Sequence, residues 1–148
     1  MGCRPEGPDG PSDFRGTFEG MTMSARKSIH IDGLSHLTGI PVATRIGPLL
    51  ISSVIAPFNP GTRQVPDGYP AQYANIFRHV GEMLKAAGGD WRHVAKMEFW
   101  APVAEARDAC EAPWNEKFPD ADSRPARHTH IATDAKAVSA SFTAYILD

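Results

Sequence analysis

Hydrophobic and polar positions change their spacing several times along the chain, and each change marks a different predicted element. Leu49–Ile55 is a short apolar run, rich in β-branched residues, that ends before a proline-rich segment, which indicates a strand. Pro41–Ile46 is predicted to be its partner strand, with Gly47-Pro48 as the turn between them. Ser28–Ile31 is a further candidate strand, so the domain is predicted to begin with a strand and a β-hairpin.

The spacing becomes helical after a predicted loop, Asn59–Pro70. Apolar side chains then recur every three or four residues on one face, at Tyr73, Ile76, Phe77, Val80, Leu84 and Ala87. Gly88-Gly89 ends this helix. Ala104–Phe118 is predicted to be a second helix, which Pro113 should kink or divide because proline lacks a backbone donor.

Three later segments have the two-residue alternation of strands. His93–Trp100 places Ala95, Met97 and Phe99 on one face and Lys96, Glu98 and Trp100 on the other. Ala126–Thr133 is also predicted to be a strand. In Val138–Leu147 the predicted core positions are Val138, Ala140, Phe142, Ala144 and Ile146, whereas the alternate positions carry Ser139, Ser141, Thr143 and Tyr145.

Together these elements predict an α+β domain in which two helices pack on one face of a mixed β-sheet. The other face of the sheet would carry Trp100, Tyr145 and small hydroxyl side chains. Aromatic side chains gathered on such a face favour contact with another subunit over contact with bulk water. We therefore expect self-association through the open face of the sheet.

Composition divides the chain into two parts. Eight of the first 20 residues are glycine or proline, and this stretch has too little apolar surface to offset the entropy of ordering. We expect residues 1–22 to be a disordered leader, and residues 23–148 to be the folded domain. The leader lacks the apolar segment of a secretory signal, and its acidic residues argue against a transit peptide.

Charge and cysteine content narrow the possible partners. The 17 acidic and 15 basic residues give a net charge of −2, which argues against nucleic acid as a partner. No segment approaches the ~18 consecutive apolar residues of a membrane span, so we expect no membrane association. Two cysteines, Cys3 and Cys110, cannot form a disulfide framework or a four-cysteine zinc site. A reducing, cytoplasmic location fits these features.

Several segments, taken in order, resemble the Rid family, which is also called YjgF-like or L-PSP. The resemblance covers roughly residues 28–147. It rests on ATRIGPLLISSVIAP at Ala43–Pro57, Asn59-Pro60-Gly61-Thr62, Gln72 with Asn75, Leu84 with Ala87-Gly88, Val94 with Lys96, and Phe118-Pro119 followed by Pro125-Ala126-Arg127. The resemblance implies a chorismate-mutase-like fold, a homotrimer with three inter-subunit clefts, and ligands that carry a carboxylate. Studied members hydrolyse 2-imino and 2-enamino acids to 2-oxo acids and ammonia without a metal or cofactor.

The resemblance assigns the substrate carboxylate to Arg127, which matches the arginine of the family's Pro-Ala-Arg motif. Arginine suits this role because its planar guanidinium can hold a carboxylate through two parallel hydrogen bonds. The alternative is a structural arginine that pairs with a nearby acid such as Glu111 or Asp122. Ser53 and Val54, at the end of a predicted strand, are the matching residues expected to line the cleft.

Four positions differ from the deaminase pattern. The family's tyrosine and serine before the first hairpin correspond to Ile40 and Pro41, and its asparagine on the second helix corresponds to Glu111. The glutamate of the last strand corresponds to Ser141, and no glutamate follows Arg127. Glu111 and Ser141 are therefore candidate catalytic residues beside Arg127, and Ile40 is a candidate substrate contact.

His128 and His130 are alternative sources of acid–base chemistry, because imidazole titrates near neutral pH. Their two-residue spacing also places both rings on one side of a strand, as a metal site would need. No third ligand is evident nearby in the sequence, since Asp134 is predicted to lie in a loop. We therefore expect no metal, and the resemblance implies no cofactor.

Two functions remain open from the sequence. The first is a Rid-like hydrolase or deaminase that acts on a small carboxylate-bearing imine or enamine. The second is a non-catalytic trimer that binds a small carboxylate metabolite through Arg127. Turnover above the spontaneous rate distinguishes the two.

Overall fold

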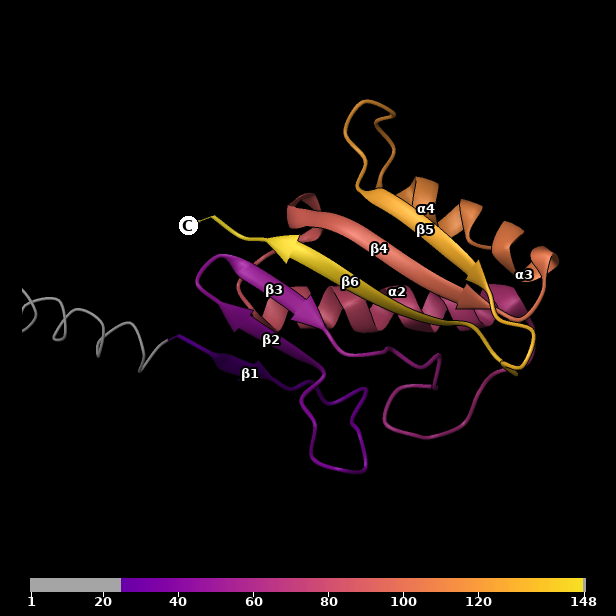
Figure 1. Ribbon diagram of the computed structural model, residues 1–148, viewed down its shortest axis with the longest axis horizontal. Helices are drawn as coiled ribbons and strands as arrows, with labels where there is room; N and C mark the ends of the chain where they lie inside the picture. Colours follow the sequence, from indigo (N-terminus) through magenta and orange to yellow (C-terminus); the bar gives the residue numbers. More distant parts are fainter. Residues whose placement is uncertain (1–24, 148) are drawn as a thin grey trace, which may run out of the picture.

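A six-stranded mixed sheet forms one layer of the fold in the computed structural model, which describes residues 25–147 (Figure 1). The predicted disordered leader, residues 1–22, lies outside the described residues. The strands are β1 (Lys27–Ile29), β2 (Ala43–Ile46), β3 (Leu49–Ser52), β4 (Val94–Ala101), β5 (Ala126–Ile131) and β6 (Ser139–Tyr145). Their order in the sheet is β1-β2-β3-β6-β4-β5, and β4 and β5 form its parallel pair. β5 is therefore an edge strand.

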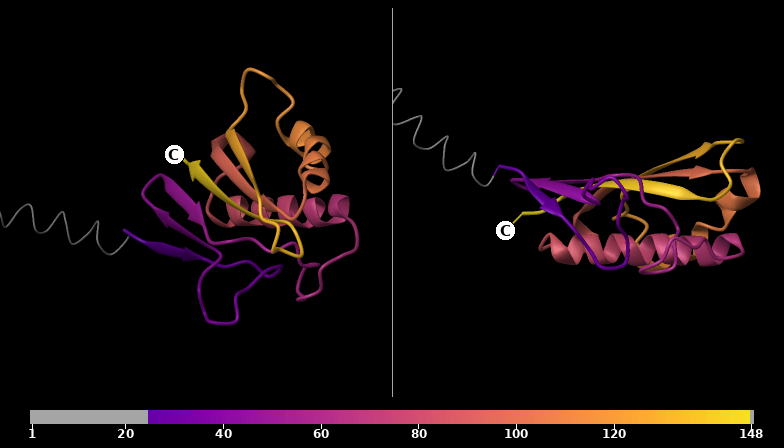
Figure 2. Two further views of the ribbon diagram at one scale, coloured as in Figure 1. Left: turned by 45° about the vertical axis from the view of Figure 1, so that its right-hand side comes forward. Right: turned by 90° about the horizontal axis from the view of Figure 1, so that it is seen from below.

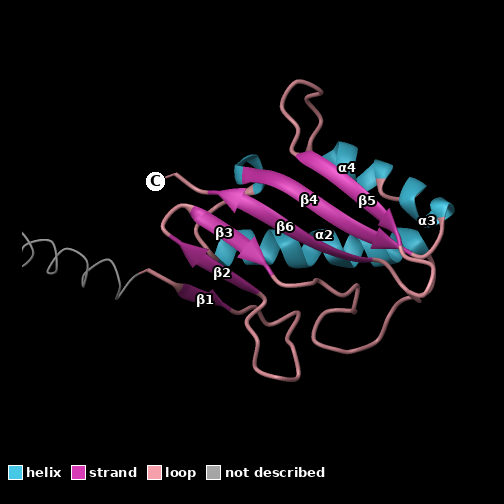
Figure 3. Cartoon of the chain, in the orientation of Figure 1, coloured by secondary structure: helices cyan, strands magenta, loops and turns pink. Residues whose placement is uncertain are grey.

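The helices form the second layer, on one face of the sheet (Figures 2 and 3). They are α2 (Tyr69–Ala86), the short 3-10 helix η1 (Trp91–His93), α3 (Ala104–Asp108) and α4 (Glu111–Lys117). The predicted α+β architecture, with its mixed sheet and one covered face, is thereby confirmed. No helix among residues 25–147 has the length and apolar character needed to cross a lipid bilayer.

The core lies between α2 and the sheet. Tyr73, Ile76 and Val80 on α2 are fully buried, as the helical spacing predicts. Phe99 on β4 is also fully buried, and its ring lies 5.6 Å from that of Tyr73 and 6.1 Å from that of Phe77. The alternation predicted for the last strand is confirmed as well, because its five apolar positions are all buried.

The first half of β4 differs from the prediction. A register shift between Val94 and Lys96 inserts one extra residue, a β-bulge, opposite β6. Ala95 is therefore exposed and Val94 is buried, whereas the sequence pattern placed Ala95 in the core. Such a bulge reverses the side-chain alternation locally, and no residue in the pattern signals it.

The predicted second helix is two short helices, and the break lies before Pro113 rather than at it. α3 ends at Asp108 and α4 begins at Glu111, so Pro113 is the third residue of α4. The first backbone N–H groups of a helix have no partner within the helix, so proline is tolerated there without the loss of a hydrogen bond. Pro113 thus lies in the first turn of a new helix.

Polar side chains of α2 hold the chain segments that connect to the sheet. His79 Nε2 lies 2.8 Å from the Phe58 carbonyl oxygen, and Asn75 Nδ2 donates to the Pro57 carbonyl at 3.1 Å. The Gln72 amide oxygen accepts from the Val138 backbone N–H at 2.9 Å, just before β6 begins. Burial lowers the pKa of His79, which keeps its imidazole neutral in the core.

Candidate functional site

Arg127 lies on edge strand β5 and projects toward the helices. Its register partner on β4 is Met97, a fully buried residue of the helix-covered face. The guanidinium carbon lies 4.8 Å from the centre of the Trp114 ring, and one terminal nitrogen is 2.5 Å from a Glu111 carboxylate oxygen. The other terminal nitrogen lies 3.8 Å from Cys110 Sγ. Three residues of the α4 region thus fix the position of this arginine.

The Arg127–Glu111 contact is an ion pair that solvent reaches. Burial alone would lower the pKa of Arg127, but the hydrogen bond to Glu111 and the Glu111 charge raise it above its usual value. The side chains of Arg127 and Glu111 are 28% and 55% exposed. A pair this accessible contributes about 0–1 kcal/mol to folding, so little free energy opposes its exchange for a ligand carboxylate.

Two buried side chains near Arg127, Cys110 and Tyr73, stay protonated in their apolar surroundings. Cys110 is buried, and burial raises the pKa of its thiol to about 11. The Tyr73 hydroxyl is buried and has no hydrogen-bond partner, and burial also raises the pKa of Tyr73. The sequence pattern predicts Tyr73 on the apolar face of its helix, and nothing in the sequence marks Tyr73, Cys110 or Trp114 as neighbours of Arg127.

Cys110 is expected to react slowly with iodoacetamide in the native protein. At pH 8 a thiol with a pKa of about 11 contains roughly two orders of magnitude less thiolate than an ordinary cysteine. The rate should rise about tenfold for each pH unit up to that pKa, as long as the fold persists. Peptide mass spectrometry separates the Cys110 product from that of Cys3. Equal Cys110 labelling rates in the native and urea-unfolded protein would contradict a protonated, buried thiol.

The other predicted site residues lie elsewhere in the chain. Ser53 and Val54 follow β3, and the Ser53 hydroxyl donates to the Pro41 carbonyl at 2.8 Å, next to Ile40. Two strands, β6 and β4, separate β3 from β5 in the sheet. Ser141 pairs with Glu98, one position along β4 from the partner of Arg127, so it faces the opposite side of the sheet. One chain therefore brings Arg127 and Glu111 together and keeps them apart from Ile40, Ser53, Val54 and Ser141.

Solved structures reproduce this arrangement of helices and strands. RidA from an Antarctic Psychrobacter is 19% identical, with a TM-score of 0.73 over 81% of this chain and 99% of that chain. YjgF from E. coli is 19% identical, with a TM-score of 0.72 over 80% of this chain and 98% of that one. YyfA from Yersinia pestis, described as a Rid-family protein of unknown function, is 17% identical, with a TM-score of 0.75 over 82% of this chain and 100% of that chain.

The chain has the Rid fold. The expected YjgF-like sheet is thereby confirmed. Neither a protein-family model nor a curated protein sequence matches the chain. At these identities the likeness establishes the fold, and the chemistry of the site rests on the residues present.

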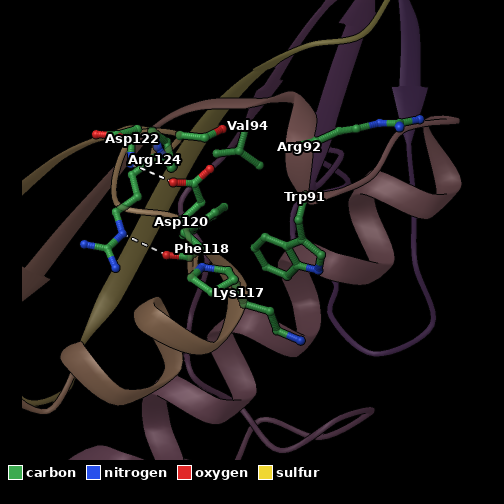
Figure 4. Close-up of a pocket in the computed structure, with 11 residues that line it drawn as sticks. Trp91, Arg92, Val94, Lys117, Phe118, Asp120, Asp122 and Arg124 are labelled. Carbon is green, nitrogen blue, oxygen red and sulfur yellow. Dashed lines mark hydrogen bonds between the residues drawn. The ribbon is translucent and has the colours of Figure 1, made fainter.

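Two clefts of this Rid-fold chain lie away from Arg127. One, of about 350 Å³, lies between η1 and the loop before β5, where Arg92, Lys117 and Arg124 mix with Asp120 and Asp122 (Figure 4). One hydrogen-bond donor of the Arg124 side chain is already used, because its Nε donates to the Phe118 carbonyl at 2.8 Å. The second cleft, of about 490 Å³, lies between α2 and α4. Neither is lined by any of the predicted site residues.

A further group of polar side chains lies on the sheet face opposite the helices. Parallel pairing of β4 and β5 places Glu98 beside His128, and His130 Nε2 lies 2.8 Å from a Glu98 carboxylate oxygen. One ligand atom from each of the three residues lies within 4.8 Å of the others. No third ligand is evident near the two histidines in the sequence, because Glu98 is 30 positions from His128 and only the strand register brings it there.

Proposed function

We propose that this chain is a divergent Rid-family protein that hydrolyses a small, carboxylate-bearing imine or enamine. One observation carries the proposal. Arg127 lies over the Trp114 ring at the open edge of the sheet, with an exchangeable acidic partner, Glu111. A guanidinium fixed in this way has little freedom to lose when it binds a planar carboxylate, which favours binding.

Binding at Arg127 requires the ligand carboxylate to replace Glu111, wholly or in part. The aromatic face of Trp114 would continue to hold the guanidinium, because a cation–π contact does not occupy the N–H donors. Glu111 would then stand within reach of the ligand atoms next to the carboxylate, including the imine carbon of a 2-imino acid. The acid that neutralises Arg127 in the free protein thus becomes available for proton transfer.

The proposed reaction adds one water molecule across the C=N bond. The substrate reacts as its protonated imine: the water oxygen bonds to the imine carbon, the C=N π electrons become the nitrogen lone pair, and Glu111 accepts one water proton, which leaves a neutral carbinolamine. Glu111 then returns that proton to the nitrogen, the C–N bond breaks to release ammonia, and the carbinolamine hydroxyl proton passes to Glu111 and on to solvent, which leaves a 2-oxo acid. A carboxylate that first accepts and then donates a proton performs general base and general acid catalysis in turn. Burial keeps Cys110 protonated, so Glu111 is the acid–base group beside Arg127 in the described residues.

The remaining predicted contacts would come from a neighbouring copy of the chain. Ile40 and Val54 are more than half exposed, on the side of the sheet remote from β5, where a second subunit can approach. The open sheet face also carries exposed apolar side chains, among them Ile51 and Tyr145, that would be covered by such contact. A cleft between two copies could therefore combine Arg127 and Glu111 of one with Ile40, Ser53 and Val54 of the next.

Self-association has a direct test. Light scattering on the purified full chain is expected to give a mass of about three times 16.0 kDa, as the family resemblance implies. Ile51→Lys, on the open sheet face, should lower that mass, whereas Leu37→Lys, at an exposed loop position, should not. A monodisperse monomer for the native chain would contradict a cleft shared between subunits.

Carboxylate binding is tested separately from turnover. A 2-oxo acid such as 2-oxobutyrate, measured by calorimetry, is expected to bind the native chain. Arg127→Ala should weaken binding by about 10- to 100-fold, because a charge-assisted bidentate contact contributes roughly 1.5–3 kcal/mol. Arg107→Ala is the matched control, since Arg107 is an exposed arginine of neighbouring α3. Equal affinities of the native chain and Arg127→Ala would remove Arg127 from the site.

Carboxylate binding without catalysis is the second candidate function, and two observations favour it. Glu111 neutralises Arg127 in the free chain. No glutamate follows Arg127, whereas the deaminase pattern has one on the last strand. Under this alternative the calorimetric result is the same, but the protein does not accelerate imine decay.

A further inference from the structure

We propose that Glu98, His128 and His130 form a binding site for a zinc-class divalent cation on the open face of the sheet. Two imidazoles and one carboxylate are the donor set of many three-ligand zinc sites. All three side chains are at least partly exposed in the single chain, so they can turn toward an ion, and a water molecule or a group of a neighbouring copy can occupy the fourth position. This inference does not rest on the proposed hydrolase function, although the cation site lies on the sheet face at which subunits are proposed to meet.

The strand register builds the site from two parts of the sequence. His128 and His130 lie two positions apart on β5, so both side chains point to the same face. Glu98 is the register partner of His128 on parallel strand β4, and Trp100 is that of His130. The His128 and His130 rings are 4.0 Å apart between centres. Rigid strands, rather than loops, thus hold the three ligands together.

The spacing of the ligand atoms suits a small cation. Ligands of tetrahedral zinc lie about 3.3–3.5 Å from one another, given metal–ligand distances of about 2.0–2.2 Å. The three candidate ligand atoms lie within 4.8 Å of one another, and the pair from Glu98 and His130 is 2.8 Å apart. Metal binding would require side-chain rotations that separate this pair slightly and bring His128 closer to it.

The surroundings of the three ligands include one aromatic ring and one cation. The Trp100 ring stacks on the His130 ring at 5.1 Å with an interplanar angle of 10°, which limits rotation of that imidazole. Lys96 Nζ lies 3.8 Å from the other Glu98 oxygen, where its charge opposes a bound cation. Lys96 therefore offers a variant that should improve binding.

The site is separate from the proposed carboxylate site. Arg127 pairs in register with Met97 on the helix-covered face, whereas Glu98, His128 and His130 lie on the opposite face. Metal binding can therefore be present or absent whatever the outcome for the hydrolase proposal.

The test is a zinc titration of the chelator-treated full chain, in competition with a chromophoric zinc indicator. We expect one high-affinity Zn²⁺ per chain, with a Kd on the order of 1 μM. Glu98→Gln and His130→Ala should each weaken binding by about tenfold or more, because each removes one of three ligands. The matched controls are Glu116→Gln and His30→Ala, at exposed positions outside the cluster, and these should leave the Kd unchanged.

Two further results complete the test. Lys96→Met should tighten Zn²⁺ binding several-fold, because it removes a positive charge next to Glu98 and leaves all three ligands in place. A misfolded variant would bind Zn²⁺ more weakly, so tighter binding cannot result from a loss of folding. Zn²⁺ should also raise the melting temperature of the native chain and leave that of His128→Ala/His130→Ala unchanged. Failure of the native chain to bind Zn²⁺ at 100-fold the expected Kd would overturn the proposal. Equal affinity of the native chain and the double variant would also overturn it, because the ion would then bind elsewhere.

Discussion

Glu111→Gln is expected to slow imine hydrolysis by about 10²–10⁴-fold, the usual contribution of a general acid–base group. The same substitution should tighten the binding of a 2-oxo acid, because the glutamine amide no longer neutralises Arg127. The two effects have opposite signs and one cause, since Glu111 is both the partner of Arg127 and the proposed proton carrier. Hydrolysis is followed by trapping the remaining imine as its semicarbazone, and binding by calorimetry.

The opposite signs make the Glu111 result decisive between the two candidate functions. Glu116→Gln, on the same helix and exposed to solvent, is the matched control and should change neither quantity. Tighter binding with an unchanged hydrolysis rate would assign Glu111 to charge neutralisation alone. Weaker binding would contradict the competition between Glu111 and the ligand for Arg127.

Phe99→Ala is expected to lower the free energy of unfolding by about 3–5 kcal/mol. Phe99 lies on β4, between β6 and β5, and its ring is fully buried against Tyr73 and Phe77 of α2. Its loss leaves a cavity between the two layers that rigid aromatic neighbours cannot fill. The free energy of unfolding is measured from urea transitions at a fixed protein concentration, since the proposed self-association would also stabilise the folded chain.

An exposed apolar position provides the control for Phe99→Ala. Leu37 is 81% exposed, so Leu37→Ala should change the free energy of unfolding by less than about 0.5 kcal/mol. A cost below about 1 kcal/mol for Phe99→Ala would mean that the interface between α2 and the sheet is packed differently from the arrangement described.

Elements with a strong hydrophobic period could be predicted from the sequence. The apolar face of α2 and the strict alternation of β6 each dictate one way to bury their side chains, and the structure follows both. The hairpin turn was also predictable, because Gly47 supplies the positive φ of 55° that the connection between β2 and β3 adopts. These signals are local, so a single segment of sequence contains them.

The bulge in β4 and the break between α3 and α4 could not be predicted in the same way. The bulge at Ala95 results from pairing with β6, which follows some 45 residues later in the chain. Pro113 indicates that the predicted helix is interrupted near this position. Proline fits either at a kink or in the first turn of a new helix, so it does not fix the place of the break. Tertiary packing, rather than the local sequence, decides between these arrangements.

In the candidate site, too, some contacts could be predicted from the sequence and others depend on tertiary structure. The alternative that Arg127 pairs with Glu111 was evident from the sequence, and the ion pair is present. Trp114 beneath the guanidinium and Glu98 beside His128 were not evident, because helix packing and strand register bring them there. The separation of Ser141 from Arg127 follows from the register of β6, β4 and β5.

The most direct test of the central claim is the decay of a 2-imino acid, generated in place by an amino-acid oxidase, with and without the protein. We predict that the native chain accelerates decay, that Arg107→Ala retains the acceleration, and that Arg127→Ala loses it. Decay at the spontaneous rate across several 2-imino acids would contradict the hydrolase. Acceleration that survives in Arg127→Ala would contradict the assignment of the carboxylate to Arg127.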